Sequence, residues 1–184
     1  MMAGRKEQAL QLVRRNEELI NGSGADTLLL SCPICYKIFS EQYNLPGIRV
    51  VHHSVYFDEL IRSGRLKIEK SDIFYAYHDP CDLGRGSGIY EEPRHIVATA
   101  AALVEAPKSR EESICCAGSL GSLTLGFKQR VPIAEGCLKN LYAAKPDAIA
   151  TACPLCYSTL LHNANRPVKD IAQILDASAS SCPT

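Results

Sequence analysis

The chain has 184 residues, 46% of them hydrophobic and 22% charged, which is enough for one compact domain or two small ones and excludes a fibrous or low-complexity chain. Twenty basic residues balance twenty acidic ones, so the charge gives no reason to expect a nucleic acid or an anionic membrane surface as the partner. No apolar run is long enough for a membrane span, and the start lacks the apolar core of a secretion signal, so we expect a soluble, cytoplasmic protein.

The first 65 residues are predicted to alternate between helix and strand. Apolar residues recur at helical spacing over Glu7–Leu19, and a turn-rich Asn-Gly-Ser-Gly segment follows. Thr27–Leu30 is a short apolar run typical of a buried parallel strand, and it leads directly into a Cys-Pro-Ile-Cys motif at the start of a helix. Ile48–Val51 is predicted as the next strand, with Ser54 as the N-cap of a further helix.

The alternation continues over residues 66–184. In chain order, the expected elements are a strand at Ile73–Tyr77, a helix from Glu91, a weak strand at Leu103–Ala106, a helix at Ala134–Ala144, a strand at Ala148–Ala152 and a helix capped by Asp170. Two glycine-bearing loops are expected between them, one with Gly84, Gly86 and Gly88 and one with Gly118, Gly121 and Gly126. The pattern predicts an α/β fold with parallel strands.

Part of the chain repeats itself. The stretch from Asp26 to Tyr36 matches the stretch from Asp147 to Tyr157, because in each an Asp is followed after five residues by Cys-Pro-x-Cys-Tyr. We interpret residues 1–65 as a partial first copy that carries only the CxxC, and residues 66–184 as a complete copy. The adjacent cysteine pair of the complete copy has no counterpart upstream of the first CxxC. The chain is therefore either a fragment cut just after its first pair or a protein that has lost its first metal site.

Nine cysteines are the outlier of the composition. In a reducing cytosol such a set more often holds metal or does redox chemistry than forms disulfides. Five of them follow predicted strands or lie in glycine-containing loops, so we expect them to meet at the carboxyl edge of one sheet. These five are Cys81, Cys115, Cys116, Cys153 and Cys156. Four thiolates complete a zinc site, so a set of five favours a polynuclear iron–sulfur cluster.

The local sequence around these thiols suits metal binding. Pro33 and Pro154 lie just inside predicted helices, so Cys32 and Cys153 are expected at helix N-termini, which stabilise thiolate. Glycines after the adjacent pair, Gly118 among them, allow the backbone to approach a bulky inorganic core.

Several other polar residues have two interpretations. His78 could donate a hydrogen bond to sulfur or move a proton, or it could be a structural histidine. Cys137 is expected as a buried core thiol, and no role is expected for Cys182. The pair Cys32 and Cys35 is either an unoccupied vestigial site or a disulfide. Arg85 and Arg94 either bind an anionic substrate or form ion pairs. His52 and His53 follow a predicted strand and could face the same sheet edge as the cysteines.

Four motifs resemble the cysteine-rich CCG domain found in the B-type and D-type chains of heterodisulfide reductase. Its relatives include the iron–sulfur subunits of glycolate oxidase, anaerobic glycerol-3-phosphate dehydrogenase and lactate utilisation. The motifs are His78-Asp-Pro-Cys-Asp-Leu-Gly-Arg85, Gly88-Ile-Tyr-Glu-Glu-Pro-Arg94, Cys115-Cys116 and Thr151-Ala-Cys-Pro-Leu-Cys-Tyr157. One departure is that Ala117 follows the adjacent pair, so the Cys-Cys-Gly element reads Cys-Cys-Ala-Gly.

The resemblance implies an α/β fold of two related halves, with an incomplete N-terminal half. It implies a non-cubane [4Fe-4S] cluster held by the five cysteines, with Cys81, Cys115 and Cys116 as catalytic residues at the cluster. It also implies a flavin- or ferredoxin-type partner subunit and a thiol, disulfide or quinone substrate, in a cytoplasmic protein that is either free or attached to the membrane through a partner. Two alternatives stay open: a zinc-stabilised structural or docking subunit, and a metal-free dithiol protein of which Cys153 is the reactive thiol.

Overall fold

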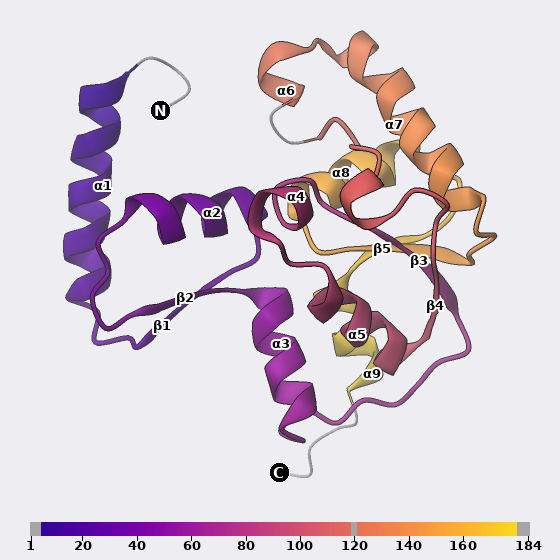
Figure 1. The fold of residues 1–184 in the computed structure, drawn as a ribbon, viewed down its shortest axis with the longest axis horizontal. Coiled ribbons are helices and arrows are strands. Elements are labelled where there is room, and N and C mark those ends of the chain that lie inside the picture. Colours follow the sequence, from indigo (N-terminus) through magenta and orange to yellow (C-terminus); the bar gives the residue numbers. More distant parts are fainter. Residues whose placement is uncertain (1–4, 119–120, 180–184) are drawn as a thin grey trace.

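The computed structural model describes residues 5–118 and 121–179, and within these ranges the chain forms two parallel sheets flanked by helices (Figure 1). This confirms the α/β fold class. The helices and strands up to Arg62 are α1 (Lys6–Asn21), β1 (Thr27–Leu30), α2 (Pro33–Gln42), β2 (Arg49–His52) and α3 (His53–Arg62). Strands β1 and β2 pair in parallel and form a two-stranded sheet.

The rest of the described chain builds a four-stranded sheet and the helices on its two faces. Its elements are β3 (Phe74–His78), α4 (Gly84–Ser87), α5 (Glu91–Ala100), β4 (Ala102–Val104), a 3-10 turn at Arg110–Glu112, α6 (Gly121–Thr124), α7 (Phe127–Tyr142), β5 (Ala148–Thr151), α8 (Pro154–Asn163), β6 (Val168–Asp170) and α9 (Ile171–Ser178). The strand order is β4-β3-β5-β6, and every neighbouring pair is parallel.

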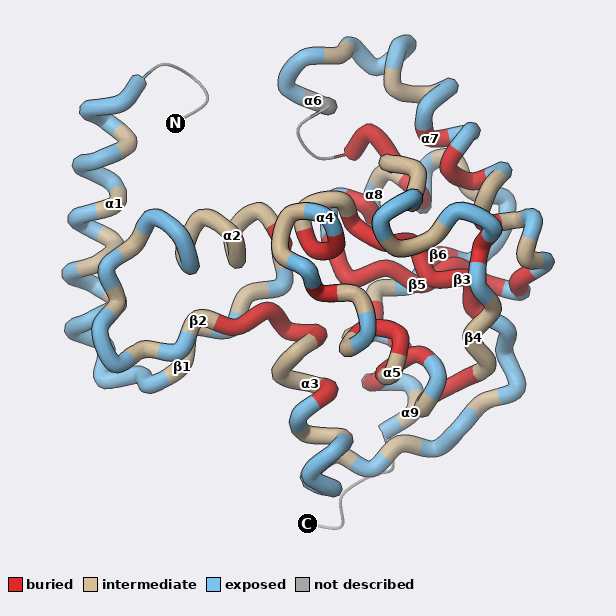
Figure 2. Tube along the Cα trace, viewed as in Figure 1, coloured by how far each residue is buried: buried red, intermediate tan, exposed pale blue. Residues whose placement is uncertain are grey.

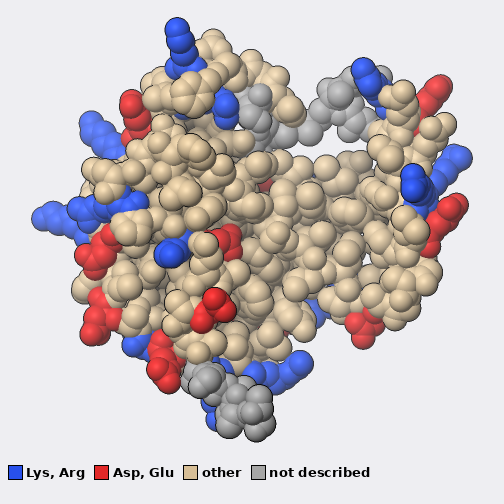
Figure 3. All heavy atoms as spheres, turned by 180° about the vertical axis from the view of Figure 1, so that it is seen from behind, with Lys and Arg blue, Asp and Glu red and all other residues tan. Residues whose placement is uncertain are grey.

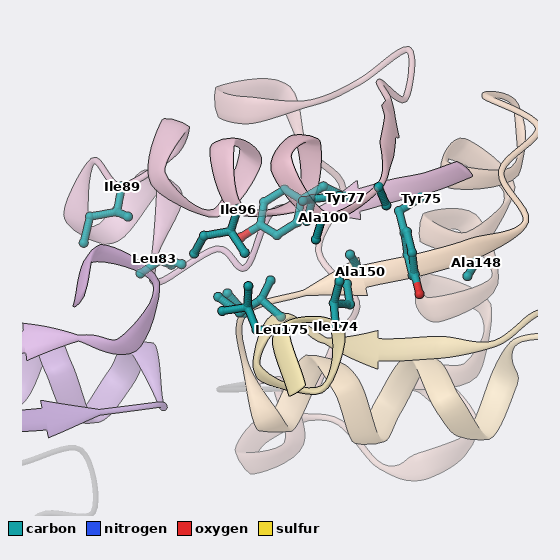
Figure 4. Close-up of a cluster of buried hydrophobic side chains, with 14 residues drawn as sticks. Tyr75, Tyr77, Leu83, Ile89, Ile96, Ala100, Ala148, Ala150, Ile174 and Leu175 are labelled. Atoms are coloured by element: carbon teal, nitrogen blue, oxygen red, sulfur yellow. The ribbon is translucent and has the colours of Figure 1, made fainter. Parts of the chain in front are cut away.

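The two central strands of the larger sheet are buried on both faces. On one face Tyr77 and Ala150 pack with side chains of α5 and α9, among them Ile96 and Ile174 (Figure 4). The other face is covered by α7 and α8, through a second cluster of buried residues that includes Leu160. Burial on both faces explains why the sequences of β3 and β5 have no polar alternation.

Several local predictions were wrong, among them the following three. The N-cap of α3 is His52 rather than Ser54, because Nδ1 of His52 accepts the Ser54 backbone N–H at 3.3 Å. The first glycine loop contains the short helix α4, where Gly84 lies so close to the Tyr90 ring that a Cβ would clash at 2.5 Å. Helix α7 begins at Phe127 rather than Ala134 and continues through its interior Pro132.

The repeat seen in the sequence is a repeat of structure. We call α1, β1 and α2 the first unit and α7, β5 and α8 the second unit; matching elements have 16, 4 and 10 residues. In both units a cysteine, Cys32 or Cys153, is the N-cap of the last helix, and the proline after it opens that helix. The predicted placement of these two cysteines at helix N-termini is confirmed.

The surroundings of the two units differ. Strand β5 has β3 on one side and β6 on the other, whereas β1 pairs with β2 alone among the described residues. Helix α1 buries none of its residues and stands at the margin of the molecule, while α7 buries four (Figure 2). The second unit is therefore part of a closed core, and the first unit has an open flank.

The described part of the chain contains no helix long and apolar enough to cross a membrane. Figure 3 shows basic and acidic side chains interspersed on the face turned away from Figure 1, without a large area of one sign. This distribution agrees with the balanced charge of the sequence.

Candidate metal centre

The register of the larger sheet brings two of the predicted cysteine positions to the same edge. His78 at the end of β3 pairs with Thr151 at the end of β5. The chain leaves both strands at this edge and reaches Cys81 after β3 and Cys153 after β5. Parallel neighbours share a carboxyl edge, which is why residues far apart in sequence meet here.

Five thiols form one connected group at this edge. The thiol of Cys115 is hydrogen-bonded to those of Cys81 and Cys116. From Cys116 the group continues to Cys156, and from Cys156 to Cys153. The structure thus brings together all five cysteines that the sequence predicted to converge, and it leaves each of them a free thiol.

Hydrogen bonds between the thiols divide them into proton donors and acceptors. Bonds from Cys116 and Cys81 hold the pKa of Cys115 well below its ordinary value, and a bond from Cys156 lowers the pKa of Cys153. The donors respond in the opposite direction, because the bond to Cys115 raises the pKa of Cys81 and of Cys116. The hydrogen bonds therefore favour the thiolate form at Cys115 and Cys153, and thiolate is the form that binds metal.

Backbone N–H groups also point at sulfur. The N–H of Ala117 donates to Sγ of Cys115 at 3.3 Å, and the N–H of Gly118 donates to Cys116. At the start of α8, the N–H groups of Leu155 and Cys156 donate to Cys153. Such donors stabilise negative charge on sulfur, whether the thiolate is free or bound to metal.

The loop after the adjacent pair is tightly constrained. Ala117 has φ +61°, in the left-handed region that favours glycine, so the departure from Cys-Cys-Gly places a side chain at a strained position. At Gly118 a Cβ would lie 2.4 Å from Oγ1 of Thr159 and 2.8 Å from the Leu155 carbonyl oxygen. The close approach that the sequence suggested for Gly118 is thus an approach to helix α8.

A histidine and a sixth cysteine lie directly behind the thiol group. A ring nitrogen of His78 and the sulfurs of Cys116 and Cys156 are all within 4.8 Å of one another. Nδ1 of His78 is 3.4 Å from Sγ of Cys137, which is buried on α7 as predicted. This contact is not visible in the sequence, because the apolar spacing of α7 indicates its buried face but not which strand that face meets.

Cys32 and Cys35 lie beside the five-thiol group rather than within its hydrogen-bonded chain. Their thiols are hydrogen-bonded to each other, and Cys35 is close enough to Cys153 for the charge on one to raise the pKa of the other. The two are half-buried free thiols. Helix α2 is held near this edge by Lys37, whose ammonium group donates to the Gly86 carbonyl oxygen at 3.2 Å.

The arginines of the matching motifs have structural partners. Arg94 is 3% exposed and forms ion pairs with Asp79 and Glu105. Asp79 also accepts the Arg110 backbone N–H at 2.9 Å, so this buried pair fixes the turn that leads to the first cysteine. Arg85 donates to the Ser113 carbonyl oxygen at 2.8 Å, in the segment just before the adjacent cysteine pair.

His52 and His53 are buried at the end of β2. Nε2 of His52 lies 3.2 Å from the Ser31 carbonyl oxygen, next to the first CxxC, and Nε2 of His53 has no hydrogen-bond partner among the described residues. Cys182 lies outside the described residues.

The fold and the site together define the class of protein: a cysteine-rich α/β domain with five thiols at one edge of its sheet. The family of the CCG cysteine-rich domain matches residues 1–40 and 75–161. The chain therefore belongs to this family.

Similar proteins are larger than this chain. It is 31% identical over 173 residues to a subunit of the dihydromethanophenazine:CoB--CoM heterodisulfide reductase of Methanosarcina acetivorans, covering 89% of this chain and 42% of that protein. It is 29% identical to a probable membrane-anchored ferredoxin of Chromohalobacter salexigens, covering 94% and 28%, and 28% identical to EtfAB:quinone oxidoreductase of Syntrophomonas wolfei, covering 89% and 26%. The chain thus spans less than half the length of these relatives.

Proposed function

We propose that the chain is an iron–sulfur component of an oxidoreductase, and that Cys81, Cys115, Cys116, Cys153 and Cys156 hold a non-cubane [4Fe-4S] cluster. The observation that carries this proposal is the connected group of five thiols at one sheet edge. Five sulfurs are one more than a tetrahedral ion binds, and an adjacent cysteine pair suits two neighbouring irons. When bound, such a cluster supplies one-electron transfer.

The residues around the thiols suit this role. The hydrogen bonds that lower the pKa of Cys115 and of Cys153 favour thiolate at both positions. Gly118 keeps the loop against α8 and directs an N–H at Cys116. Three of the sulfurs are buried, at Cys116, Cys153 and Cys156, while Cys81 and Cys115 are half-buried and form the side from which a substrate approaches. On this basis we assign Cys81, Cys115 and Cys116 as the catalytic residues.

We propose a flavin- or ferredoxin-type subunit as the electron donor and a disulfide, thiol or quinone as the substrate. Support comes from the names of relatives, which describe a heterodisulfide reductase subunit, a ferredoxin and a quinone oxidoreductase. The name of one relative includes a membrane anchor, which supports a cytoplasmic component that reaches the membrane through a partner.

We also propose that residues 1–65 are a partial copy and residues 66–184 a complete copy of one domain. The equal lengths of matching elements in the first and second units support this division. In this arrangement Cys32 and Cys35 are a vestigial or incomplete site.

Anaerobic reconstitution with iron and sulfide tests the cluster proposal. We expect wild type to gain about four irons per chain and a broad visible absorption. Cys153→Ser is expected to lose most of this iron, whereas Cys32→Ser, the equivalent change in the first unit, is expected to keep it. Equal iron content in the two variants would contradict the proposed ligand set.

A second candidate is a zinc-stabilised docking subunit. It is favoured by one observation, that His78, Cys116 and Cys156 place three ligand atoms within 4.8 Å of one another, as a mononuclear site requires. One zinc per chain that survives anaerobic purification, with no iron taken up on reconstitution, would support this candidate over the first.

A further inference from the structure

Two buried residues outside the five-thiol group face each other behind it. His78 ends β3 and is 2% exposed, and Cys137 lies in the middle of α7 and is 1% exposed. Their closest atoms, Nδ1 and Sγ, are 3.4 Å apart. A buried imidazole without a polar partner destabilises the fold, and the thiol of Cys137 supplies such a partner to His78.

The protonation states of the pair follow from burial. Desolvation lowers the pKa of His78 to about 4 and raises the pKa of Cys137 above its ordinary value. At neutral pH the imidazole is therefore uncharged with one N–H, and the thiol keeps its proton. Sulfur is a weak acceptor, so the favoured arrangement has the S–H of Cys137 donating to Nδ1, which leaves the ring proton on Nε2.

The ring that Cys137 holds lies beside two of the proposed ligand sulfurs. One ring nitrogen is within 4.8 Å of both Cys116 and Cys156, and the charge of Cys115 also acts on His78. An N–H donor beside metal-bound thiolates stabilises the additional negative charge of a reduced cluster, which raises its reduction potential.

We propose that His78 and Cys137 are a pair of positioning residues for the iron–sulfur centre: Cys137 fixes the tautomer and orientation of His78, and the N–H of His78 stabilises the reduced state through Cys116 and Cys156. This inference rests on the proposed function for its effect on potential. The hydrogen bond between the pair is a property of the metal-free chain.

The reduction potential of the reconstituted full chain tests the effect on the centre. Cys137→Ala removes the donor to Nδ1, and we expect a tenfold change in the one-electron equilibrium constant against reduction, which corresponds to a potential about 59 mV lower. Cys137→Ser restores an O–H donor and is expected to recover most of the difference. Leu138→Ala, an adjacent buried residue of α7, controls for packing and should lower stability without this shift. Equal potentials in wild type, Cys137→Ala and Cys137→Ser would overturn the proposal.

A second measurement does not need the cluster. In reduced, metal-free protein, histidine ring ¹⁵N shifts report the tautomer of His78. We expect the Nε2–H form in wild type and Cys137→Ser, and a mixture of tautomers in Cys137→Ala. An Nδ1–H ring in wild type would overturn the pair. Absence of iron uptake by wild type would instead overturn the proposed function and the effect on potential, with the tautomer still deciding the hydrogen bond.

Discussion

In the second unit Ala150 of β5 is fully buried between β3 and β6, whereas its counterpart in the first unit, Leu29 of β1, is 45% exposed. The local structures of the two units agree in element length, in the cysteine N-cap and in the proline that follows. Their surroundings differ: within the described chain β5 has strands on both sides, whereas β1 has a strand on one side only. Local sequence thus builds the same strand-to-helix turn with its Cys-Pro-x-Cys motif twice. Only the turn of the second unit is surrounded by segments that bring further cysteines to it.

The largest effect is expected from truncating equivalent strand residues. Ile149 in β5 is fully buried, and Leu28, its counterpart in β1, is half-buried. Ile149→Ala is expected to lower the free energy of unfolding by about 2–5 kcal/mol, because it leaves a cavity between the sheet and helices α7 and α8. For Leu28→Ala we expect a loss of about 1 kcal/mol. Urea unfolding of the reduced protein measures both, and similar losses would show that the first unit is buried in solution.

Glycine replacements test whether the thiol site of the second unit depends on the loop after Cys115 and Cys116 that packs against α8. Gly118→Ala puts a Cβ against Thr159 and Leu155, so we expect a loss of about 1–3 kcal/mol and weaker metal uptake. Gly136→Ala is the matched control, since no atom lies within 4 Å of its new Cβ on the exposed side of α7. This control is expected to stabilise the helix slightly. A loop that tolerates alanine at both positions equally would contradict the close approach to α8.

The helix after β2 is capped by a histidine and the helix after β6 by an aspartate, and the stability of the first is expected to depend on pH. Burial lowers the pKa of His52 to about 4 and of His53 to about 3, whereas α9 is capped by Asp170. In the unfolded chain these histidines take up protons below pH 6.5, so the unfolded state binds more protons and stability falls as pH decreases from 6.5 towards 4.

Between pH 7 and 5.5 the expected loss is roughly 1 kcal/mol for each of the two histidines. Denaturation curves across this range measure it. His53→Gln is expected to flatten the slope, and His162→Gln, at the exposed end of α8, is expected to leave it unchanged. A His53→Gln variant with the wild-type slope would show that His53 is not buried in solution.

The smallest effect concerns the residue after the adjacent cysteine pair. Ala117 has φ +61°, so Ala117→Gly removes a steric cost of about 1 kcal/mol. Ala143 at the end of α7 has φ −61°, and Ala143→Gly is expected to destabilise the protein by up to about 1 kcal/mol instead. Thermal unfolding of the two variants gives the signs. A loss of stability in both variants would show that Ala117 has an ordinary backbone conformation in solution.

Several features were readable from local sequence because their causes are local. Asp170 was predicted as an N-cap, and its carboxylate accepts the Ala172 N–H at 2.9 Å, a contact between residues two positions apart. Helix α7 starts earlier than predicted because the Gln129 side chain accepts the Gly126 N–H at 3.0 Å and caps its first turn, whereas all four buried residues of the helix lie after Pro132. His52 was overlooked as a cap because histidine is not among the residues that usually fill this position.

The sequence by itself determined the alternation of strands and helices apart from β6 and the short helices α4 and α6, the two Cys-Pro-x-Cys motifs and the identity of the thiols, because periodicity, capping and proline act within a few residues. Only the tertiary structure decided that Cys115 meets Cys81, that Arg94 pairs with Asp79 and that Cys137 meets His78. These contacts join residues between 15 and 59 positions apart, and in each of them one partner lies at the end of β3 or in the turn that follows it. Strand order and register are properties of the whole packed core, which no local pattern encodes.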